Sequence, residues 1–267
     1  MKTIFITGTS SGLGKAAVQL FHSNGWHVIA TMRNVEKAKD FAGMERVTVL
    51  PLDITNEEQI KTTVAKAIGL GSIDIVLNNA AYGAIGPLEG MSQAQIAQVV
   101  DTNLLGAIRV TQAFIPHFRE RKSGLFINVT SMAGFLTFPF ASIYSAVKFG
   151  LQGWSEGMNY ELAPFGIRIK TVAPGYIKTE FGSNTLIVPA EPYKPMMDRF
   201  LSVIADPALA QQGSTAEDIA AVVYEAATDG KDRVHYVAGK DAHMLHDRRL
   251  AIGAEAAIKE IAQQFLG

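Results

Sequence analysis

Tyr144 and Lys148 are four residues apart in an expected helix, so their side chains would emerge on one face. A free tyrosine has a pKa of about 10 and is therefore a poor acid or base at neutral pH. A fixed ammonium group nearby favours the phenolate, and each unit of pKa lowering corresponds to about 1.4 kcal/mol. Taken alone, the pair indicates little, because a surface helix often carries two such residues.

Two further polar residues are candidates for the same site. Ser131 ends the segment NVTS thirteen residues before Tyr144, and a hydroxyl there could stabilise charge that develops on a substrate oxygen. The alternative is a hydroxyl that only satisfies backbone groups at a strand end. Asn103 lies in the middle of another expected helix, where asparagine is a poor helix former, and a nearby helix cap is its simplest explanation.

The segment TGTSSGLGK, residues 7–15, places three glycines directly after an apolar run. Such glycines allow a tight turn and a close approach of the backbone to a phosphate at a helix N-terminus. A P-loop is excluded, because Thr9 stands where that motif needs glycine and Ala16 replaces the hydroxyl that binds magnesium. The spacing T-G-x-x-x-G-x-G also differs from the common dinucleotide motif G-x-G-x-x-G. A glycine-rich turn without a ligand remains the alternative.

Further motifs follow along the chain, and their joint presence is much more specific than any one of them. They are Asn78-Asn79 in NNAAYG, Asn103 in DTNLLGAIRV, Ser131, Tyr144-x-x-x-Lys148 and Ala173 to Gly175 in APG. With these motifs the sequence closely resembles the short-chain dehydrogenase/reductase family over essentially the whole chain. Family members often have glycine where this chain has Ala81, whose methyl group could shift the loop beside the cofactor.

The resemblance implies an oxidoreductase that moves hydride between a nicotinamide cofactor and a carbonyl or alcohol. It assigns Tyr144 as general acid or base, Lys148 as its tuner and ribose anchor, Ser131 as partner of the substrate oxygen, and Asn103 as holder of a relay water. The expected cofactor-binding residues are Gly8, Ser10, Ser11, Gly12, Leu13, Gly14, Arg33, Asp53, Ile54, Asn79, Ala80, Tyr144, Lys148, Pro174, Gly175, Ile177 and Thr179. A non-catalytic dinucleotide-binding sensor on the same fold is the alternative function.

NADP(H) is the expected cofactor because of residues 31–34, TMRN. An NAD enzyme usually has an acidic residue here, but Met32 takes that place and the first acid is Glu36. The guanidinium of Arg33 suits a 2′-phosphate, to which Ser10 and Ser11 could also donate. An exposed surface arginine is the alternative. Asp53 is expected to hydrogen-bond the adenine of either cofactor.

Short apolar runs and helical patterns alternate along the chain and must position these groups. We expect strands at 3–7, 27–32, 47–53, 73–79, 125–130, 167–173 and 234–239. Helices are expected at 13–24, 35–42, 56–69, 92–119, 143–163 and 215–229. Unbroken apolar strands are typical of a parallel sheet covered on both faces. The prediction is α/β: one doubly wound Rossmann-type domain, 1–267, with a mainly parallel seven-stranded sheet and helices on both faces.

Two segments stand outside this alternation. Residues 180–213 are expected to form a substrate lid, because connections this long are usually functional. Its apolar residues and three phenylalanines near Ser131 predict a bulky apolar or aromatic substrate, unless they only pack a core. They are Phe135, Phe138, Phe140, Phe181, Leu186, Ile187, Val188, Tyr193, Met196, Met197 and Phe200. The helical tail, 241–267, is expected to pack as a terminal helix rather than to bind a partner.

Composition excludes several classes of protein. The net charge of −1 and a pI of about 6.6 give no footprint for nucleic acid or an acidic membrane. There are no cysteines, and His243 and His246, beside Asp241 and Asp247, are interpreted as a solvated polar turn rather than a metal site. We expect a cytoplasmic protein without a signal peptide or membrane span. The family often pairs through helices that match 92–119 and 143–163, which implies a homodimer or homotetramer.

Overall fold

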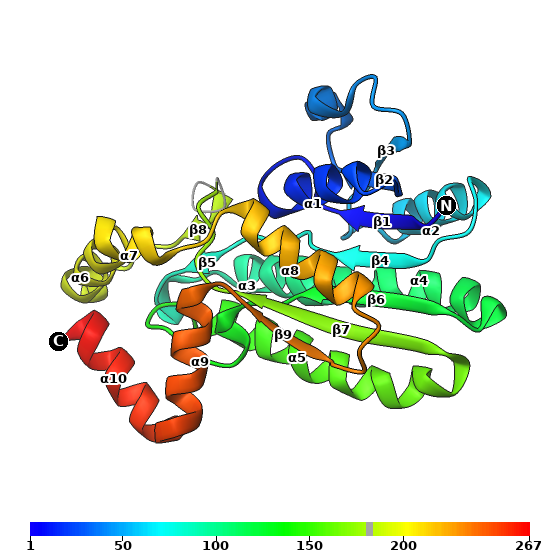
Figure 1. The fold of residues 1–267 in the computed structure, drawn as a ribbon. Coiled ribbons are helices and arrows are strands. Elements are labelled where there is room, and N and C mark those ends of the chain that lie inside the picture. The colour runs from blue at the N-terminus through cyan, green and yellow to red at the C-terminus, as the bar shows by residue number, and fades with distance from the viewer. Residues whose placement is uncertain (180–183) are drawn as a thin grey trace.

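The centre of the molecule is a parallel sheet of seven strands in the order β3-β2-β1-β4-β6-β7-β9 (Figure 1). The computed structural model describes residues 1–179 and 184–267, and for residues 208–210 it describes the backbone alone. The strands are β1 Thr3–Thr7, β2 His27–Met32, β3 Val47–Pro51, β4 Ile75–Asn78, β6 Gly124–Val129, β7 Ile167–Pro174 and β9 His235–Ala238. Every pair in this sheet is parallel, so the predicted Rossmann-type class is confirmed.

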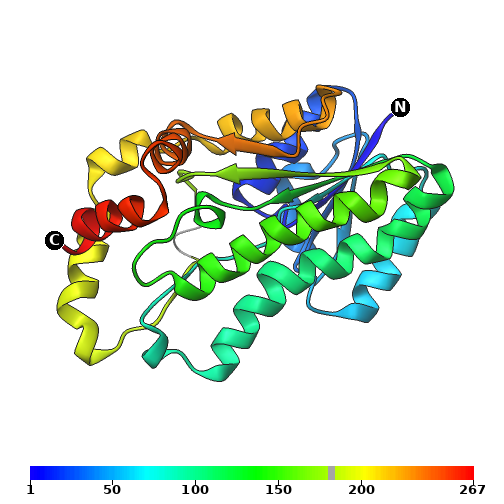
Figure 2. The ribbon, with the colours of Figure 1, turned by 90° about the horizontal axis from the view of Figure 1, so that it is seen from below.

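Helices cover both faces of the sheet. On one face α1, Gly12–Ser23, packs against α8, Ala216–Thr228. On the other face lie α2, Glu57–Gly69, α4, Gly106–Arg121, and α5, Ser142–Leu162, as the view from below shows (Figure 2). The capping box of Thr215 and Asp218 fixes the start of α8. Pro164, in the 3₁₀ turn after α5, cannot continue that helix.

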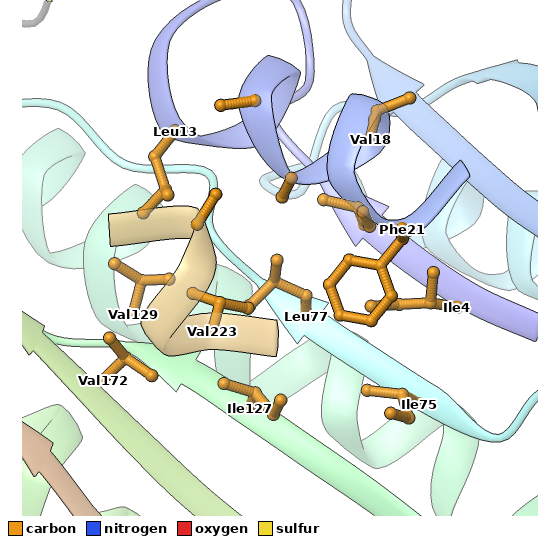
Figure 3. Packing of buried hydrophobic residues seen from close by; sticks show 14 of the residues in the cluster. Ile4, Leu13, Val18, Phe21, Ile75, Leu77, Ile127, Val129, Val172 and Val223 are labelled. Carbon is orange, nitrogen blue, oxygen red and sulfur yellow. The ribbon is translucent and has the colours of Figure 1, made fainter. Parts of the chain in front are cut away.

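The apolar strands are buried because each face packs against its own helix layer. Figure 3 shows Phe21 of α1 and Val223 of α8 in one cluster with Leu77 of β4. On the opposite face, Phe114 of α4 meets Phe5 of β1 edge to face, with ring centroids 4.9 Å apart. These two layers hold the ends of the central strands, and the loops that follow them, in fixed positions.

Three predicted elements differ from the structure. The single helix expected at 92–119 is divided into α3, Gln93–Val100, a π-helical turn, Asp101–Leu105, and α4. The helix expected at 35–42 is a 3₁₀ helix, Val35–Phe41. The strand expected at 73–79 is shorter, and a second sheet of β5, Ala84–Ile85, and β8, Leu186–Ile187, was not predicted.

The segment 180–213 and the tail contain helices of their own. They are α6, Lys194–Ile204, α7, Pro207–Gln212, α9, Lys240–Ile252, and α10, Ala254–Leu266. Gly253, with φ +83°, separates the two tail helices. All four gather at one end of the sheet in both views (Figures 1 and 2). Phe181 of the predicted lid lies outside the described residues. In the part of the chain that is described, no helix has the length and apolar character needed to cross a bilayer.

Candidate active site

The topology of the sheet places one group of loops together. In the sheet, β2 and then β3 lie on one side of β1, and β4, β6 and β7 follow in turn on the other side. In parallel sheets the crevice beyond the carboxyl ends of the strands, at such a switch point, is where ligands bind. The loops after β1, β4, β6 and β7 carry many of the residues singled out from the sequence. The others lie on helices, as Asn103, Tyr144 and Lys148 do, or follow β2 and β3, as Arg33, Asp53 and Ile54 do.

The glycine loop between β1 and α1 has no room for a side chain at Gly8, nor has the first turn of α1 at Gly14. Gly8 and Gly12 have φ values of +72° and +53°, which favour glycine. A Cβ on Gly8 would lie 2.7 Å from Cα of Ala80, and a Cβ on Gly14 would lie 2.6 Å from Nδ2 of Asn79. These glycines therefore allow the loop to pack against the loop after β4, and the loop leads directly into the N-terminus of α1, where a phosphate can bind.

Side-chain hydrogen bonds fix the loop after β4 against β1. The hydroxyl oxygen of Thr7 accepts from the backbone N–H groups of Asn79 and Ala80, over 3.0 and 3.1 Å. Nδ2 of Asn79 donates to the carbonyls of Thr7 and Gly8, over 2.9 and 3.0 Å. The Asn79 side chain thus orders the glycine loop itself. Thr7 was not predicted to have this role.

Asn103 lies in the π-helical turn and holds the other side of the same loop. Its Oδ1 accepts from the backbone N–H of Tyr82 over 2.9 Å, and its Nδ2 donates to the Tyr82 carbonyl over 2.8 Å. The loop is therefore fixed on both sides of Ala81, through Ala80 and Tyr82. A helix cap does not explain Asn103. Single π turns inside helices frequently occur at functional sites.

Ser131, Tyr144 and Lys148, which we call the acid–base group, meet beyond the end of β6. Ser131 precedes a 3₁₀ turn, Met132–Gly134, and its hydroxyl accepts from the N–H of Ala133 over 3.1 Å. Burial raises the pKa of Tyr144 to about 12, and a side-chain hydrogen bond with Ser131 acts in the opposite direction. The pKa of this phenol therefore moves upward, against the lowering expected from the sequence.

Lys148 is the most deeply buried member of the acid–base group. Its side chain is 2% exposed, and Nζ donates to the carbonyl of Val129 over 3.0 Å. Nζ also lies 5.7 Å from the ring centroid of Tyr144. Burial lowers the pKa of Lys148 to about 8. At neutral pH the site therefore combines a protonated phenol with an ammonium group beside it.

The residues expected to hold adenosine follow β2 and β3, on the side of β1 that is away from the acid–base group. Arg33 is exposed at the end of β2. Asp53 is half-buried, and its Oδ1 accepts from the backbone N–H and the hydroxyl of Thr55, over 2.9 and 2.7 Å. Ile54 is buried below Gly106 of α4. Lys15, which follows the glycine loop, pairs with Asp40 over 2.7 Å.

The loop after β7 crosses from the acid–base group toward the glycine loop. Pro174 ends β7, Ile177 forms a parallel bridge with Ser214, and the Thr179 side chain lies 3.5 Å from where a Cβ on Gly12 would be. The loops that carry predicted cofactor residues therefore all follow the carboxyl ends of parallel strands, from β3 on one side of β1 to β7 on the other.

The histidines of the tail lie on a helix, not on a solvated turn. His243 and His246 belong to α9, and Asp241 in the first turn of that helix is buried. The ring of His246 meets the Phe135 ring, with centroids 5.0 Å apart. Within residues 1–179 and 184–267 there is no group of three or more acidic or histidine side chains placed to hold a metal ion.

The phenylalanines near Ser131 pack against the lid and tail helices. Phe138 meets Phe265 of α10, with centroids 5.8 Å apart, and Phe140 meets Phe200 of α6, with centroids 5.6 Å apart. Phe200 and Phe265 also contact each other, at 5.5 Å between centroids. We call these four residues and Leu136 the aromatic cluster. It joins the segment after Ser131 to α6 and α10.

Comparison with known proteins gives consistent matches. A family model described as short chain dehydrogenase matches residues 2–186. An uncharacterized oxidoreductase of Schizosaccharomyces pombe is 35% identical over 211 residues, which cover 78% of this chain and 88% of the relative. Retinol dehydrogenase 8 of Bos taurus is 37% identical over 194 residues, which cover 69% of this chain and 62% of that enzyme.

A solved structure also matches over almost its whole length. It is a short chain dehydrogenase from Burkholderia cenocepacia in complex with NADP, with a TM-score of 0.79 and 25% sequence identity. The match covers 98% of this chain and 99% of that one. The fold around the glycine loop and the acid–base group is thus shared with a protein whose structure contains NADP.

Proposed function

Because the chain belongs to the short-chain dehydrogenase family of oxidoreductases, we propose that it interconverts a carbonyl and an alcohol with NADP(H). One observation supports this most directly. The hydroxyl groups of Ser131 and Tyr144 are hydrogen-bonded, and the ammonium of Lys148 is buried beside them, after strand β6, which only β4 separates from the strand that leads to the glycine loop. Proton transfer and nucleotide binding can therefore take place in adjacent parts of one crevice.

The residues present fit a dinucleotide. Gly8 and Gly14 let the loop after β1 pack closely against Ala80 and Asn79, and this loop leads into the N-terminus of α1, which favours the negative charge of a pyrophosphate. When bound, the cofactor supplies or accepts the hydride at the substrate carbon. Arg33 is the residue that we propose for the 2′-phosphate, and Asp53 for the adenine. Lys148 would hold the nicotinamide ribose through its Nζ.

The acid–base group is suited to give a proton to a carbonyl oxygen. Tyr144 keeps its proton at neutral pH, since its pKa is raised to about 12. Ser131 would donate a hydrogen bond to the same substrate oxygen and stabilise the charge that develops there. As the proton leaves Tyr144, the ammonium of Lys148 stabilises the phenolate that remains. The site without ligands is thus prepared for reduction more than for oxidation.

We propose a bulky apolar or aromatic substrate. Val188, Met197 and Phe200 of the lid segment are buried, and Phe200 lies in the aromatic cluster with Leu136, which follows Ser131 in the chain. Phe140 has φ +60°, which bulky residues rarely adopt, and its carbonyl accepts from Gly86 N–H over 2.7 Å. One relative is named a retinol dehydrogenase, and retinol is an apolar alcohol. The lid role of 180–213 is part of this proposal.

The experiment is to follow NADPH absorbance with a panel of carbonyl compounds. We expect turnover that is faster with large apolar ketones and aldehydes than with small charged ones. Preference for small charged substrates would contradict the substrate class. The alternative, a non-catalytic sensor, predicts NADPH binding without turnover on any member of the panel, but it gives no reason for the buried ammonium beside Tyr144.

Assembly and location remain proposals of the same kind. On α5, Phe149 and Tyr160 are exposed, and a Cβ on Gly153 or Gly157 would meet no atom within 4 Å. We propose that this face pairs two copies into a homodimer, or further into a homotetramer, and light scattering that finds only monomers would contradict it.

The cytoplasmic location expected from the sequence stays a prediction, which microscopy of the tagged protein would check.

A further inference from the structure

Asp241, in the first turn of α9, is hydrogen-bonded to the loop that follows β7. The backbone N–H of Tyr176 donates to Oδ2 of Asp241 over 2.6 Å, and Asp241 is 9% exposed. The other carboxylate oxygen, Oδ1, is also buried, and no partner for it exists in the described part of the chain. Burying a carboxylate is costly, although the nearby N-terminus of α9 reduces the cost. A carboxylate held in this way needs an explanation.

Gly175 provides the space for this carboxylate. A Cβ on Gly175 would overlap both carboxylate oxygens of Asp241. Gly175 does not have a positive φ, so its backbone conformation does not require glycine. A Cβ on Gly239 would also lie within 2.9 Å of Oδ1. Two glycines from different segments therefore accommodate one acidic side chain, and the glycine of the APG motif is explained by Asp241.

The position of the loop indicates which half of a dinucleotide it would contact. β7 lies beside β6, which leads to Ser131, whereas Arg33 and Asp53 follow β2 and β3 on the far side of β1. From Gly175 the loop runs on to Thr179, which lies against Gly12 of the glycine loop. Asp241 therefore fixes the loop near the reactive half of the crevice, away from the part proposed for adenosine.

We propose that Asp241 is a positioning residue for the nicotinamide half of the cofactor. It does not touch the cofactor itself. Its carboxylate holds the backbone at Gly175–Tyr176, so that Ile177 and Thr179 are in place before the cofactor binds. The inference rests on the proposed function, because it assumes a dinucleotide in this crevice. It also makes the first turn of the tail helix α9 part of the cofactor site.

The test compares two ligands that differ by the nicotinamide half. NADPH contains that half, whereas 2′,5′-ADP carries only the adenosine part with its 2′- and 5′-phosphates. For Asp241→Ala we expect NADPH affinity to fall about tenfold or more, because a hydrogen bond to a charged group is lost. Affinity for 2′,5′-ADP should stay within about twofold. Calorimetry of both ligands measures this, and binding of 2′,5′-ADP also shows that the variant is folded.

Two further variants separate positioning from general stability. Asp241→Asn keeps an oxygen that can accept from Tyr176, so its NADPH affinity should stay within about threefold of the wild type. Asp247→Ala removes an exposed carboxylate from the same helix and should leave both affinities unchanged. Gly175→Ala should weaken NADPH binding in the wild type, but should add little to Asp241→Ala, because the carboxylate that it would overlap is then absent.

The outcomes are distinguishable. Selective loss of NADPH affinity in Asp241→Ala, with recovery in Asp241→Asn, supports the positioning role. Unchanged NADPH affinity in Asp241→Ala, or equal losses for the two ligands, would overturn it. If wild-type protein binds neither ligand, the proposed cofactor itself is wrong. The wild-type protein alone therefore tests the cofactor, whereas the variants test the positioning role.

Discussion

The side-chain amide of Asn103 is hydrogen-bonded to both backbone polar groups of Tyr82, with 2.9 Å to the N–H and 2.8 Å to the carbonyl. This pair joins a π-helical turn between α3 and α4 to the loop after β4. The same loop contacts the glycine loop through Asn79. Asn103 therefore acts on the glycine loop through the backbone of the loop after β4.

Asn103→Ala should leave the N–H and the carbonyl of Tyr82 without these partners. Each unsatisfied buried group costs about 1–3 kcal/mol, so we expect a lower melting temperature and weaker NADPH binding. Asn103→Asp can still accept from the Tyr82 N–H, but it places a buried carboxylate oxygen against the Tyr82 carbonyl, so its losses should exceed those of Asn103→Ala. Thermal unfolding and nucleotide fluorescence measure the two effects, and equal behaviour of both variants would contradict the role of the paired amide.

Tyr144→Phe removes the hydroxyl and keeps the packing of the ring. Turnover should collapse while NADPH binding survives, because only the transferable proton and its bond to Ser131 are lost. A residual kcat above about a tenth of the wild-type value corresponds to a barrier change under about 1.4 kcal/mol. That result would show that Tyr144 is not the general acid.

The activity should also depend on the charge of Lys148. Burial disfavours its charged form, so the ammonium is present below its pKa of about 8 and is lost as the pH rises through that value. The rate of carbonyl reduction should therefore fall above about pH 8, where an exposed lysine would still be charged. The pH profile of kcat/KM for NADPH, which reports groups of the free enzyme, measures this. A profile that stays flat to about pH 10 would refute the dependence.

Much of the fold was predictable because its strands are buried on both faces and appear as unbroken apolar runs. The two-residue strands β5 and β8 have no periodicity to detect, and the π turn at 101–105 has the composition of an ordinary helix. The bond between Asp241 and Tyr176 spans 65 residues and uses a backbone N–H, which every residue but proline offers. The role of Thr7 was not predictable for the same reason, since its partners are backbone groups.

The upward shift in the pKa of Tyr144 was not predictable from the sequence, for a different reason. The spacing of Tyr144 and Lys148 on a helix is visible in the sequence, but the burial of both side chains depends on how α5 packs on β6 and on the turn after Ser131. Burial opposes the charged form of each group, so it raises one pKa and lowers the other. Sequence spacing predicts which groups meet, whereas their protonation depends on packing.

Arg33 decides the cofactor preference in the proposal. Arg33 is exposed at the end of β2, so its guanidinium can reach a 2′-phosphate without displacing a partner in the core. A charge-assisted hydrogen bond contributes about 1.5–3 kcal/mol before screening, so Arg33→Ala should weaken NADPH binding about ten- to a hundredfold. NADH lacks the phosphate and should bind equally to both proteins.

Nucleotide fluorescence at low and high salt measures these affinities. Because the contact is exposed, the difference between wild type and Arg33→Ala should shrink as salt is added. Lys259→Ala, which removes an exposed charge from α10, is the matched control for net charge and should change neither affinity. Wild-type protein that binds NADH as tightly as NADPH would show that Arg33 is only a surface charge, and the preference for NADP(H) would then be wrong even if the acid–base group performs the proposed chemistry.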